Sequence, residues 1–400
     1  MAEILFLAHR IPYPPDRGDK IRSWHILKHL ATLGRVHLAC FADDAADAAH
    51  LPALREALGG RLGEAHVEVR TTGKAVAGAR ALMAGRPVSL TLFDSRAMHG
   101  FVRGVLGRHA GASVFAFSGQ MAQFVPKGVP RFVMDFVDMD SAKFESYGAG
   151  SGPMAAIHRR EAELLFAFER ETAARADTSL FVSEAEASLF RSRAGLQGAD
   201  IRALGNGVDL EFYDPTVRYE RSCGEGPLIA LTGQMDYAPN VDAASWFAEE
   251  VLPRVQGAHF AIVGRNPPAS VARLRGERVT VTGAVPDVRN WLQAADVVVA
   301  PLRIARGVQN KVLEAMAMAR PVVASPAAFE GIDAIPGRDL IVADGAEAMA
   351  AAVTALLADR SAADAIGRAA RQRVESVYRW EVQLAPLASI LRLDERQAAA

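Results

Sequence analysis

The sequence predicts an α/β protein with two doubly wound domains, each built around a parallel sheet. Short apolar runs alternate with longer amphipathic segments along the chain. The runs are continuously apolar, as in strands that are buried on both faces of a parallel sheet. The chain has 400 residues, whereas one hydrophobic core rarely exceeds roughly 250–300 residues, so we expect two domains.

Six apolar runs in the first half predict the strands of one sheet: Ile4–Ala8, Val36–Ala42, His66–Val69, Ser113–Phe117, Phe132–Val137 and Thr178–Val182. The segments between them have helical spacing, as in Ile26, Leu27 and Leu30. Six runs in the second half predict another sheet: Leu228–Thr232, His259–Val263, Val279–Thr282, Val297–Pro301, Pro321–Ala324 and Leu340–Val342. Because the alternation occurs twice, it indicates two sheets.

Turn residues mark the seam between the two halves. Gly205–Asp209 and Asp214–Pro215 have turn chemistry, and a polar, glycine-containing stretch follows at 219–226. We therefore expect an N-terminal domain over residues 1–200 and a second domain over residues 201–377. Residues 361–393 have a helical pattern that is interrupted near 378–380.

Composition excludes several classes of function. The net charge is -1, so the broad basic surface that nucleic-acid binding requires is not expected. Cys40 and Cys223 are far apart and the histidines have no metal-ligand spacing, so we expect neither a disulfide framework nor a bound metal. The chain starts with a strand pattern rather than a signal peptide, and no apolar run approaches roughly 20 residues. These features favour a soluble, cytoplasmic protein.

Ligands of open α/β sheets bind outside the carboxyl ends of the strands. The turn after the first apolar run, His9–Arg22, is long for a strand-to-helix loop and is stiffened by three prolines. It lacks the G-x-G-x-x-G pattern of a nicotinamide site. Within it we expect the acceptor-binding residues, at the start of the next helix and near an anionic acceptor: Arg17, Gly18, Asp19 and Arg22. The alternative is an ordinary surface loop.

Two turns of the second half favour phosphate binding. Gly233 follows the first strand and would let the backbone approach a phosphate closely. Arg265 follows the next strand and a glycine, where a guanidinium could grip phosphate oxygens as a fork. A plain turn and a surface arginine are the respective alternatives.

The segment Pro301–Ser325 is the most informative, because it has a strand, a glycine turn, a helix and a strand. Gly307 and Val308 fall where the helix begins, and unpaired amides there attract a diphosphate. Arg306 and Lys311 add positive charge. Glu314 lies three residues after Lys311 on the same helix face, where it could bind sugar hydroxyls. The alternative is a surface ion pair.

Asp135, Asp138 and Asp140 follow the fifth apolar run. We expect Asp138 to orient the acceptor hydroxyl. Capping of the next helix by Asp140 or Ser141 is the alternative.

Glu314–Ala317 and the following Arg320–Ser325 resemble the C-terminal domain of glycosyltransferase family 4. Other matching segments occur in the family's order: Ala176–Asp177, Val182–Glu184, Gly205–Asp209, Val263–Arg265, Val281–Val285, Ala295–Val297 and Tyr378–Glu381. His9–Arg22, Met235–Tyr237 and Asp138–Ser141 are also similar to the sugar transferases of PEP-CTERM/exosortase exopolysaccharide systems.

The resemblance implies a GT-B fold, in which two Rossmann-like domains face a cleft and a C-terminal helix, residues 378–400, crosses back to the N-terminal domain. It implies retaining transfer from a nucleotide-diphosphate-sugar without a metal or another cofactor. Glu314 matches the glutamate that binds the ribose hydroxyls. Lys311 and Arg265 would stabilise the leaving diphosphate, and Gly233, Arg306, Gly307 and Val308 would complete the donor site.

The chain departs from the family at three places. Arg306 stands at the position of the family's first glutamate, Gln234 and Met235 stand near that of a glycine–lysine pair, and the histidine after the fifth strand is absent. Two alternatives therefore stay open: a nucleotide-sugar epimerase and a non-catalytic scaffold protein. The expected acceptor is a glycan or a lipid-linked sugar, which would bring the chain to the inner membrane face as a peripheral protein.

Overall fold

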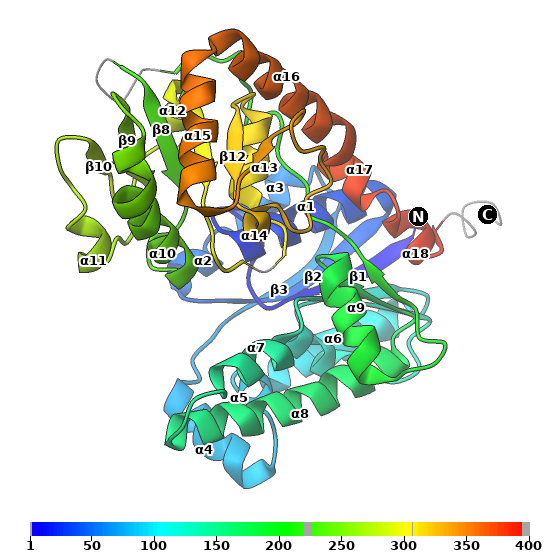
Figure 1. Ribbon diagram of the computed structural model, residues 1–400. Helices are drawn as coiled ribbons and strands as arrows, with labels where there is room; N and C mark the ends of the chain where they lie inside the picture. The colour runs from blue at the N-terminus through cyan, green and yellow to red at the C-terminus, as the bar shows by residue number, and fades with distance from the viewer. Residues whose placement is uncertain (1, 220–225, 306, 394–400) are drawn as a thin grey trace. The chain divides into compact units, whose positions relative to one another are not determined.

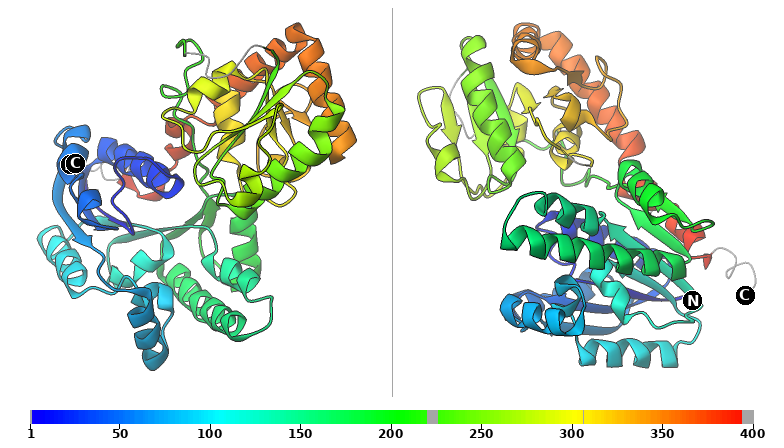
Figure 2. Two further views of the ribbon diagram at one scale, coloured as in Figure 1. Left: turned by 90° about the vertical axis from the view of Figure 1, so that its left-hand side faces the viewer. Right: turned by 60° about the horizontal axis from the view of Figure 1, so that its bottom comes forward.

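The computed structural model describes residues 2–219, 226–305 and 307–393. The chain divides into two compact units. The first comprises residues 1–205 and 384–400, and the second comprises residues 206–383. Each unit is a sheet with helices packed on both faces (Figures 1 and 2).

The sheet of the first unit has seven strands in the order β3-β2-β1-β4-β5-β6-β7, and every pairing is parallel. The strands are β1 (Glu3–Ala8), β2 (Arg35–Ala42), β3 (Leu62–Val69), β4 (Ser113–Phe117), β5 (Arg131–Val137), β6 (Thr178–Phe181) and β7 (Ile201–Ala203). The first six coincide with the predicted runs. Edge strand β7 was not predicted, because two of its three residues are exposed and it has no apolar run.

The helices of the first unit connect these strands. They are α1 (Gly18–Leu33), α2 (Ala45–Ala48), α3 (Leu51–Ala57), α4 (Lys74–Ala84), α5 (Val88–Thr91), α6 (Arg96–Arg108), the 3-10 helix η1 (Gly119–Phe124), α7 (Asp140–Tyr147), α8 (Pro153–Arg175) and α9 (Glu184–Ala194). Helix α18 (Leu387–Ile390) also belongs to this unit. There the Arg131 Nε donates a hydrogen bond of 2.8 Å to the Ile390 carbonyl.

The sheet of the second unit has six parallel strands in the order β10-β9-β8-β11-β12-β13. They are β8 (Leu228–Thr232), β9 (His259–Val263), β10 (Val279–Val281), β11 (Val297–Ala300), β12 (Val322–Ala324) and β13 (Ile341–Val342). The helices are α10 (Ala238–Trp246), the π-helical η2 (Phe247–Val251), the 3-10 helix η3 (Leu252–Arg254), α11 (Ala269–Ala272), α12 (Arg289–Ala294), α13 (Asn310–Ala317), α14 (Pro326–Phe329), α15 (Gly345–Ala358), α16 (Arg360–Val377) and α17 (Trp380–Leu384).

Both sheets confirm the predicted fold class. The central strands β1 and β8 are buried on both faces, which is why their sequences lack polar alternation. In each sheet the strand order reverses beside the first strand, between β1 and β4 and between β8 and β11. Ligands of doubly wound folds bind outside the carboxyl ends of the strands at such a switch point. These two edges are therefore where a site is expected.

Among the helices within the described residues, none combines the length and the apolar content that a membrane span requires.

Candidate active site

Two glycines bring the turns after β8 and β9 into direct contact. Gly233 has a φ of 151°, and a Cβ at this position would lie 2.8 Å from the side-chain nitrogen of Asn240. A Cβ on Gly264 would lie 1.6 Å from the carbonyl oxygen of Gly233. Because neither position has room for a side chain, the two backbones can pack this closely. Gly233, predicted as a donor-site residue, lies at the carboxyl edge of the sheet.

Lys311 of α13 reaches the turn after β8. Its Nζ donates a hydrogen bond to the Oδ1 of Asn240, and the Nδ2 of Asn240 donates one of 2.8 Å to the Gln234 carbonyl. Asn240 is buried. Burial lowers the pKa of Lys311 to about 8, so the amine is still mostly protonated at neutral pH. The structure therefore holds a cation beside Gly233, where the sequence predicts phosphate binding.

Glu314 lies one helical turn beyond Lys311. Burial raises the pKa of its carboxyl group, while a hydrogen bond from the Tyr213 hydroxyl and the charge of Lys311 act in the opposite direction. The pKa of Tyr213 is raised by burial and by Glu314. Tyr213 thus fixes the orientation of the carboxyl group that was expected to bind ribose hydroxyls.

Among the other predicted donor residues, Arg265 follows β9, and Gly307 and Val308 precede α13. The Gln234 side-chain amide lies against the exposed guanidinium of Arg265, with its oxygen oriented to accept. Gly307 has a φ of 66°, and the place of a Cβ there is open space. Val308 follows it, and in the described part of the chain the N-cap residue Gln309 makes no side-chain bond to the amides of α13. Arg306 lies outside the described residues.

A cavity of about 900 Å³ lies in the first unit, at the carboxyl ends of its strands. Aromatic rings and charged groups line it together: His9, Arg10, Asp19, Asp43, Arg70, Thr71, Thr72, Gly73, Leu92, Phe93, Phe117, Ser118, Gln120, Phe136, Val137, Asp138, Asp140, Lys143 and Phe144. Apolar walls with a few convergent polar groups are typical of small-molecule sites. The cavity is therefore the candidate acceptor site.

Ion pairs fix one wall of this cavity. Asp19 accepts from His9 at 3.1 Å and from Arg10 at 2.6 Å, and Asp43 contacts Arg10 at 3.1 Å and Arg70 at 2.9 Å. Burial would raise the pKa of Asp19, but the hydrogen bonds from His9 and Arg10 outweigh it and lower the pKa. Burial lowers the pKa of His9. This wall is therefore a fixed array of charges.

Two carboxyl groups, from Asp138 and Asp140, lie on another part of the wall. Burial raises the pKa of both, that of Asp140 to about 6, and Lys143 partly offsets the effect. The N-cap residue of α7 is Met139, which makes no side-chain capping bond. Capping by Asp140 or Ser141, the alternative from sequence, is therefore not what the structure shows. A carboxylate with a raised pKa in a cavity is a candidate for hydrogen bonding to a substrate hydroxyl.

Two non-glycine residues of the cavity wall have left-handed backbone conformations. Ser118 follows β4 with a φ of 75°, and Val137 ends β5 with a φ of 70°. Positive φ is rare for a β-branched residue and costs on the order of 1–3 kcal/mol. Because strained backbone concentrates at functional sites, this observation supports the same edge of the sheet.

The predicted acceptor residues separate into two groups. Asp19 lines the cavity, Gly18 begins α1, and Arg17 forms an ion pair of 2.7 Å with Asp43 at the cavity wall. Arg22 does not meet a ligand: it is 1% exposed and its Nε donates at 3.1 Å to Asp135 in the core. The structure thus brings Arg22 into the core and not to the cavity wall, unlike Asp19. A buried guanidinium needs such a partner, and this one comes from a distant strand.

Sequence reasoning missed most of the cavity's charged residues. His9 and Arg10 follow β1, Asp43 follows β2 and Arg70 follows β3. Each is the first or second residue after a predicted strand, so the position itself was a usable signal. Asn240 gave no comparable signal, because it reaches the donor turn from a helix.

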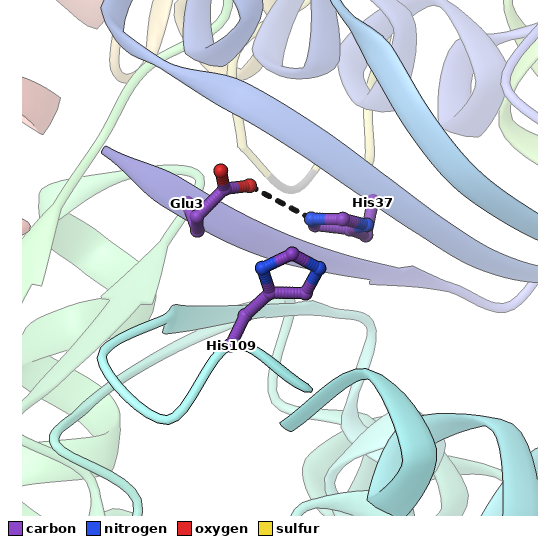
Figure 3. A group of neighbouring side chains, drawn as sticks. All are labelled: Glu3, His37 and His109. Carbon is purple, nitrogen blue, oxygen red and sulfur yellow. Dashed lines mark hydrogen bonds and ion pairs between the residues drawn. The ribbon is translucent and has the colours of Figure 1, made fainter. Parts of the chain in front are cut away.

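One group of side chains within the described residues has a spacing that could hold a metal ion: Glu3, His37 and His109 (Figure 3). Glu3 begins β1, so the group lies at the amino end of the sheet, opposite the cavity. The His37 Nδ1 accepts from the backbone N–H of Glu64 at 3.1 Å, which places the ring proton on Nε2, 2.8 Å from Glu3. A metal ligand needs a free lone pair at that nitrogen. The geometry is thus that of a hydrogen-bonded pair.

A family model described as "Glycosyl transferases group 1" matches residues 226–359, which include the donor-site residues of α13. A GDP-mannose-dependent alpha-(1-6)-phosphatidylinositol monomannoside mannosyltransferase of Mycobacterium tuberculosis is 30% identical over 241 residues. That match covers 55% of this chain and 62% of the relative, so it spans less than two thirds of the relative's length.

Solved structures match along the whole chain. Sucrose-phosphate synthase from Thermosynechococcus elongatus superposes with a TM-score of 0.70 at 17% identity, covering 100% of both chains. Anabaena HepE in complex with UDP gives a TM-score of 0.66 at 15% identity, covering 98% of this chain and 100% of that one. The chain therefore has the GT-B fold, and its residues 226–359 match the glycosyl transferases group 1 model.

Proposed function

We propose that the chain is a retaining glycosyltransferase, which moves a sugar from a nucleotide-diphosphate-sugar to a glycan or lipid-linked sugar. The observation that carries the proposal is the pair Lys311 and Glu314, held one turn apart on α13 by Asn240 and Tyr213. The pair lies within the segment that matches the glycosyl transferases group 1 model.

The donor site has groups for each part of a nucleotide-sugar. Glu314 would accept hydrogen bonds from the ribose hydroxyls. The amides at the start of α13 and the Lys311 ammonium would bind the diphosphate, with Arg265 beside it. The leaving diphosphate gains negative charge as the glycosidic bond breaks, and fixed cations stabilise that charge in the transition state. In this proposal the protein's own cations take the part that a metal plays elsewhere.

The acceptor would enter the cavity of the first unit. Asp138, assisted by Asp140, would orient the hydroxyl that attacks the sugar, and the phenylalanine rings would contact its carbon skeleton. The M. tuberculosis relative is named for a lipid acceptor, and another relative, from Rhizobium leguminosarum bv. viciae, is named a lipopolysaccharide core biosynthesis mannosyltransferase. Both names support an acceptor that is a glycan or a lipid-linked sugar.

A thermal-shift panel of nucleotide diphosphates and nucleotide-sugars, with and without magnesium, tests the donor site. GDP-mannose comes first because a relative's name includes it. A ligand at about 100 times its dissociation constant should stabilise the protein by ~2.7 kcal/mol, and Glu314→Ala should abolish the shift. NMR of the transfer product then gives the anomeric configuration. Turnover of the donor alone would point to an epimerase, and no shift with any nucleotide would point to a scaffold protein.

A further inference from the structure

Helix α4 exposes large apolar side chains and buries small ones, the reverse of the usual pattern in a globular protein. Its alanines Ala77 and Ala81 are fully buried, whereas Leu82 is 64% exposed and Met83 is 82% exposed. Helices normally bury their large apolar side chains and expose the small or polar ones. The sequence of α4 is thus not explained by packing within its own unit.

The start of α8 adds to the same exposed apolar surface. Met154 and Ile157 are 61% and 49% exposed. The Arg160 guanidinium of α8 donates a hydrogen bond of 3.3 Å to the Ala81 carbonyl of α4, so the two helices are neighbours. Both figures show α4 beside the first turns of α8 (Figures 1 and 2). We call the exposed side chains of Leu82, Met83, Met154 and Ile157 the apolar patch.

The charge near the apolar patch is mainly positive. Arg70 and Arg86 are paired with Asp43 and Asp94 at 2.9 and 3.0 Å, so the excess charge comes from Arg80, Arg159 and Arg160. Residues 70–93 contain Arg70, Lys74, Arg80 and Arg86 and no acidic residue, and residues 146–160 contain Arg159 and Arg160 and no acidic residue. The chain as a whole has a net charge of -1, so this concentration is local. Of the next two acids on α8, Glu161 is 2% exposed and is bound by the amides of Val88 and Ser89, whereas Glu163 is exposed.

The structure assigns a partner to the apolar patch: we propose that it binds the surface of an anionic lipid bilayer. Apolar side chains would enter the acyl boundary while arginines remain among the headgroups, the arrangement of an interfacial amphipathic helix. Exposed apolar patches of monomeric proteins usually mark interaction sites. The excess of arginines over acids in these two segments fits a negatively charged surface better than an apolar groove of another protein.

The position of the apolar patch links it to the acceptor cavity. Residues 70–73 line the cavity and lead directly into α4, and Lys143 and Phe144 of α7 line it shortly before α8 begins. A lipid-linked acceptor could therefore stay in the bilayer while its sugar occupies the cavity. This part of the inference rests on the proposed function, whereas bilayer binding itself does not.

Sedimentation with vesicles tests the proposal. We expect the protein to sediment with vesicles of phosphatidylcholine and phosphatidylglycerol, less with phosphatidylcholine alone, and less at high salt. The double variant Leu82→Ser/Met83→Ser should bind at least about tenfold more weakly, because two exposed apolar side chains no longer enter the bilayer. Arg80→Glu should bind about tenfold more weakly through charge.

Matched controls are Ile335→Ser and Lys28→Glu, an exposed apolar and an exposed basic residue outside the apolar patch, which should bind like the unchanged protein. Unchanged melting temperatures exclude unfolding as the cause. Equal binding by Leu82→Ser/Met83→Ser would overturn the proposal. So would a dimer in solution that this variant dissociates without any vesicle binding, since the patch would then join two copies. Vesicle binding by a protein that transfers no sugar would contradict the proposed function and leave the bilayer proposal standing.

Discussion

At the residue scale, the donor site depends on side chains that hold each other in place. Lys311 and Glu314 are the groups that would contact the nucleotide-sugar, and Asn240 and Tyr213 are the residues that restrict their rotation. The cost of burying these polar groups is offset by the hydrogen bonds among them. A variant that removes one group should therefore also affect its neighbour.

Lys311→Ala should lower the transfer rate by ~10²–10³, the loss seen when one preorganised donor of a charge-stabilising site is removed. Stability should not fall. Because the pKa of Lys311 is about 8, below its usual 10.5, the charged amine destabilises the folded state at neutral pH. Steady-state kinetics and thermal melting measure both effects, with Lys28→Ala as the control. Near-normal turnover would contradict the assigned role.

Tyr213→Phe removes the hydrogen bond to Glu314 and leaves the ring in place. We expect donor binding to weaken about fivefold, as for the loss of one hydrogen bond. The bond lowers the pKa of Glu314, so its removal should raise that pKa. The acidic limb of the pH profile for donor affinity should therefore move to higher pH. Calorimetric titrations across the acidic range would reveal an unmoved limb if Tyr213 only fills space.

At the element scale, α7 and α8 are joined by a buried carboxyl group. Glu169 of α8 accepts hydrogen bonds from the backbone and the hydroxyl of Ser141 on α7. The residues that follow Met139 on α7 include the cavity-lining Asp140, Lys143 and Phe144. The position of this cavity wall thus depends on the contact between the two helices.

Glu169 should make stability fall as pH rises. Burial raises its pKa from 4.5 to about 8, so the folded state holds its proton more tightly than the unfolded state does. The stabilisation is complete below about pH 4.5 and is lost through about pH 8, a change of a few kcal/mol. Glu169→Gln should flatten this dependence in denaturant melts at several pH values. An equally steep decline in the variant would assign the effect to another group.

The sequence predicted the strands better than it predicted contacts between side chains that lie far apart in the chain. Continuous apolar runs such as Ile4–Ala8 revealed twelve strands, whereas β7 has too little buried surface to leave a pattern. Positions directly after strands, such as Gly233, lie together at the carboxyl edge of the sheet, as predicted for strand ends. Arg22 was expected at the acceptor but lies in the core. A basic residue in a loop-like sequence does not show that an acid 113 residues away in the sequence will contact it. Local sequence patterns therefore reveal which strands are buried, but they do not reveal which residues far apart in the sequence form contacts.

At the scale of the whole molecule, each of the two units would bind a different substrate of the proposed reaction. The second unit has the proposed donor residues and the matched glycosyl transferases group 1 segment, and the first has the cavity and the apolar patch. Each unit has its own core, so each can respond to a ligand separately.

Hydrogen exchange should separate the two responses. A nucleoside diphosphate should protect backbone amides most strongly in the turns after β8 and β9 and in the first turn of α13, because bound ligand suppresses local opening. Anionic vesicles should instead protect α4 and the start of α8. Mass spectrometry of peptides from both regions reports the two patterns. Protection by the nucleotide chiefly in residues 1–205 would place the donor in the other unit.

The division of the first unit between residues 1–205 and 384–400 has a consequence during synthesis on the ribosome. The second unit is one uninterrupted stretch, and all of it is translated before residues 384–400 of the first. The Arg131 guanidinium, buried in the finished unit, takes its carbonyl acceptor from Ile390, which is translated 259 residues later. The unit whose translation begins first is therefore the last to be completed, because its final residues are made after the whole of the other unit.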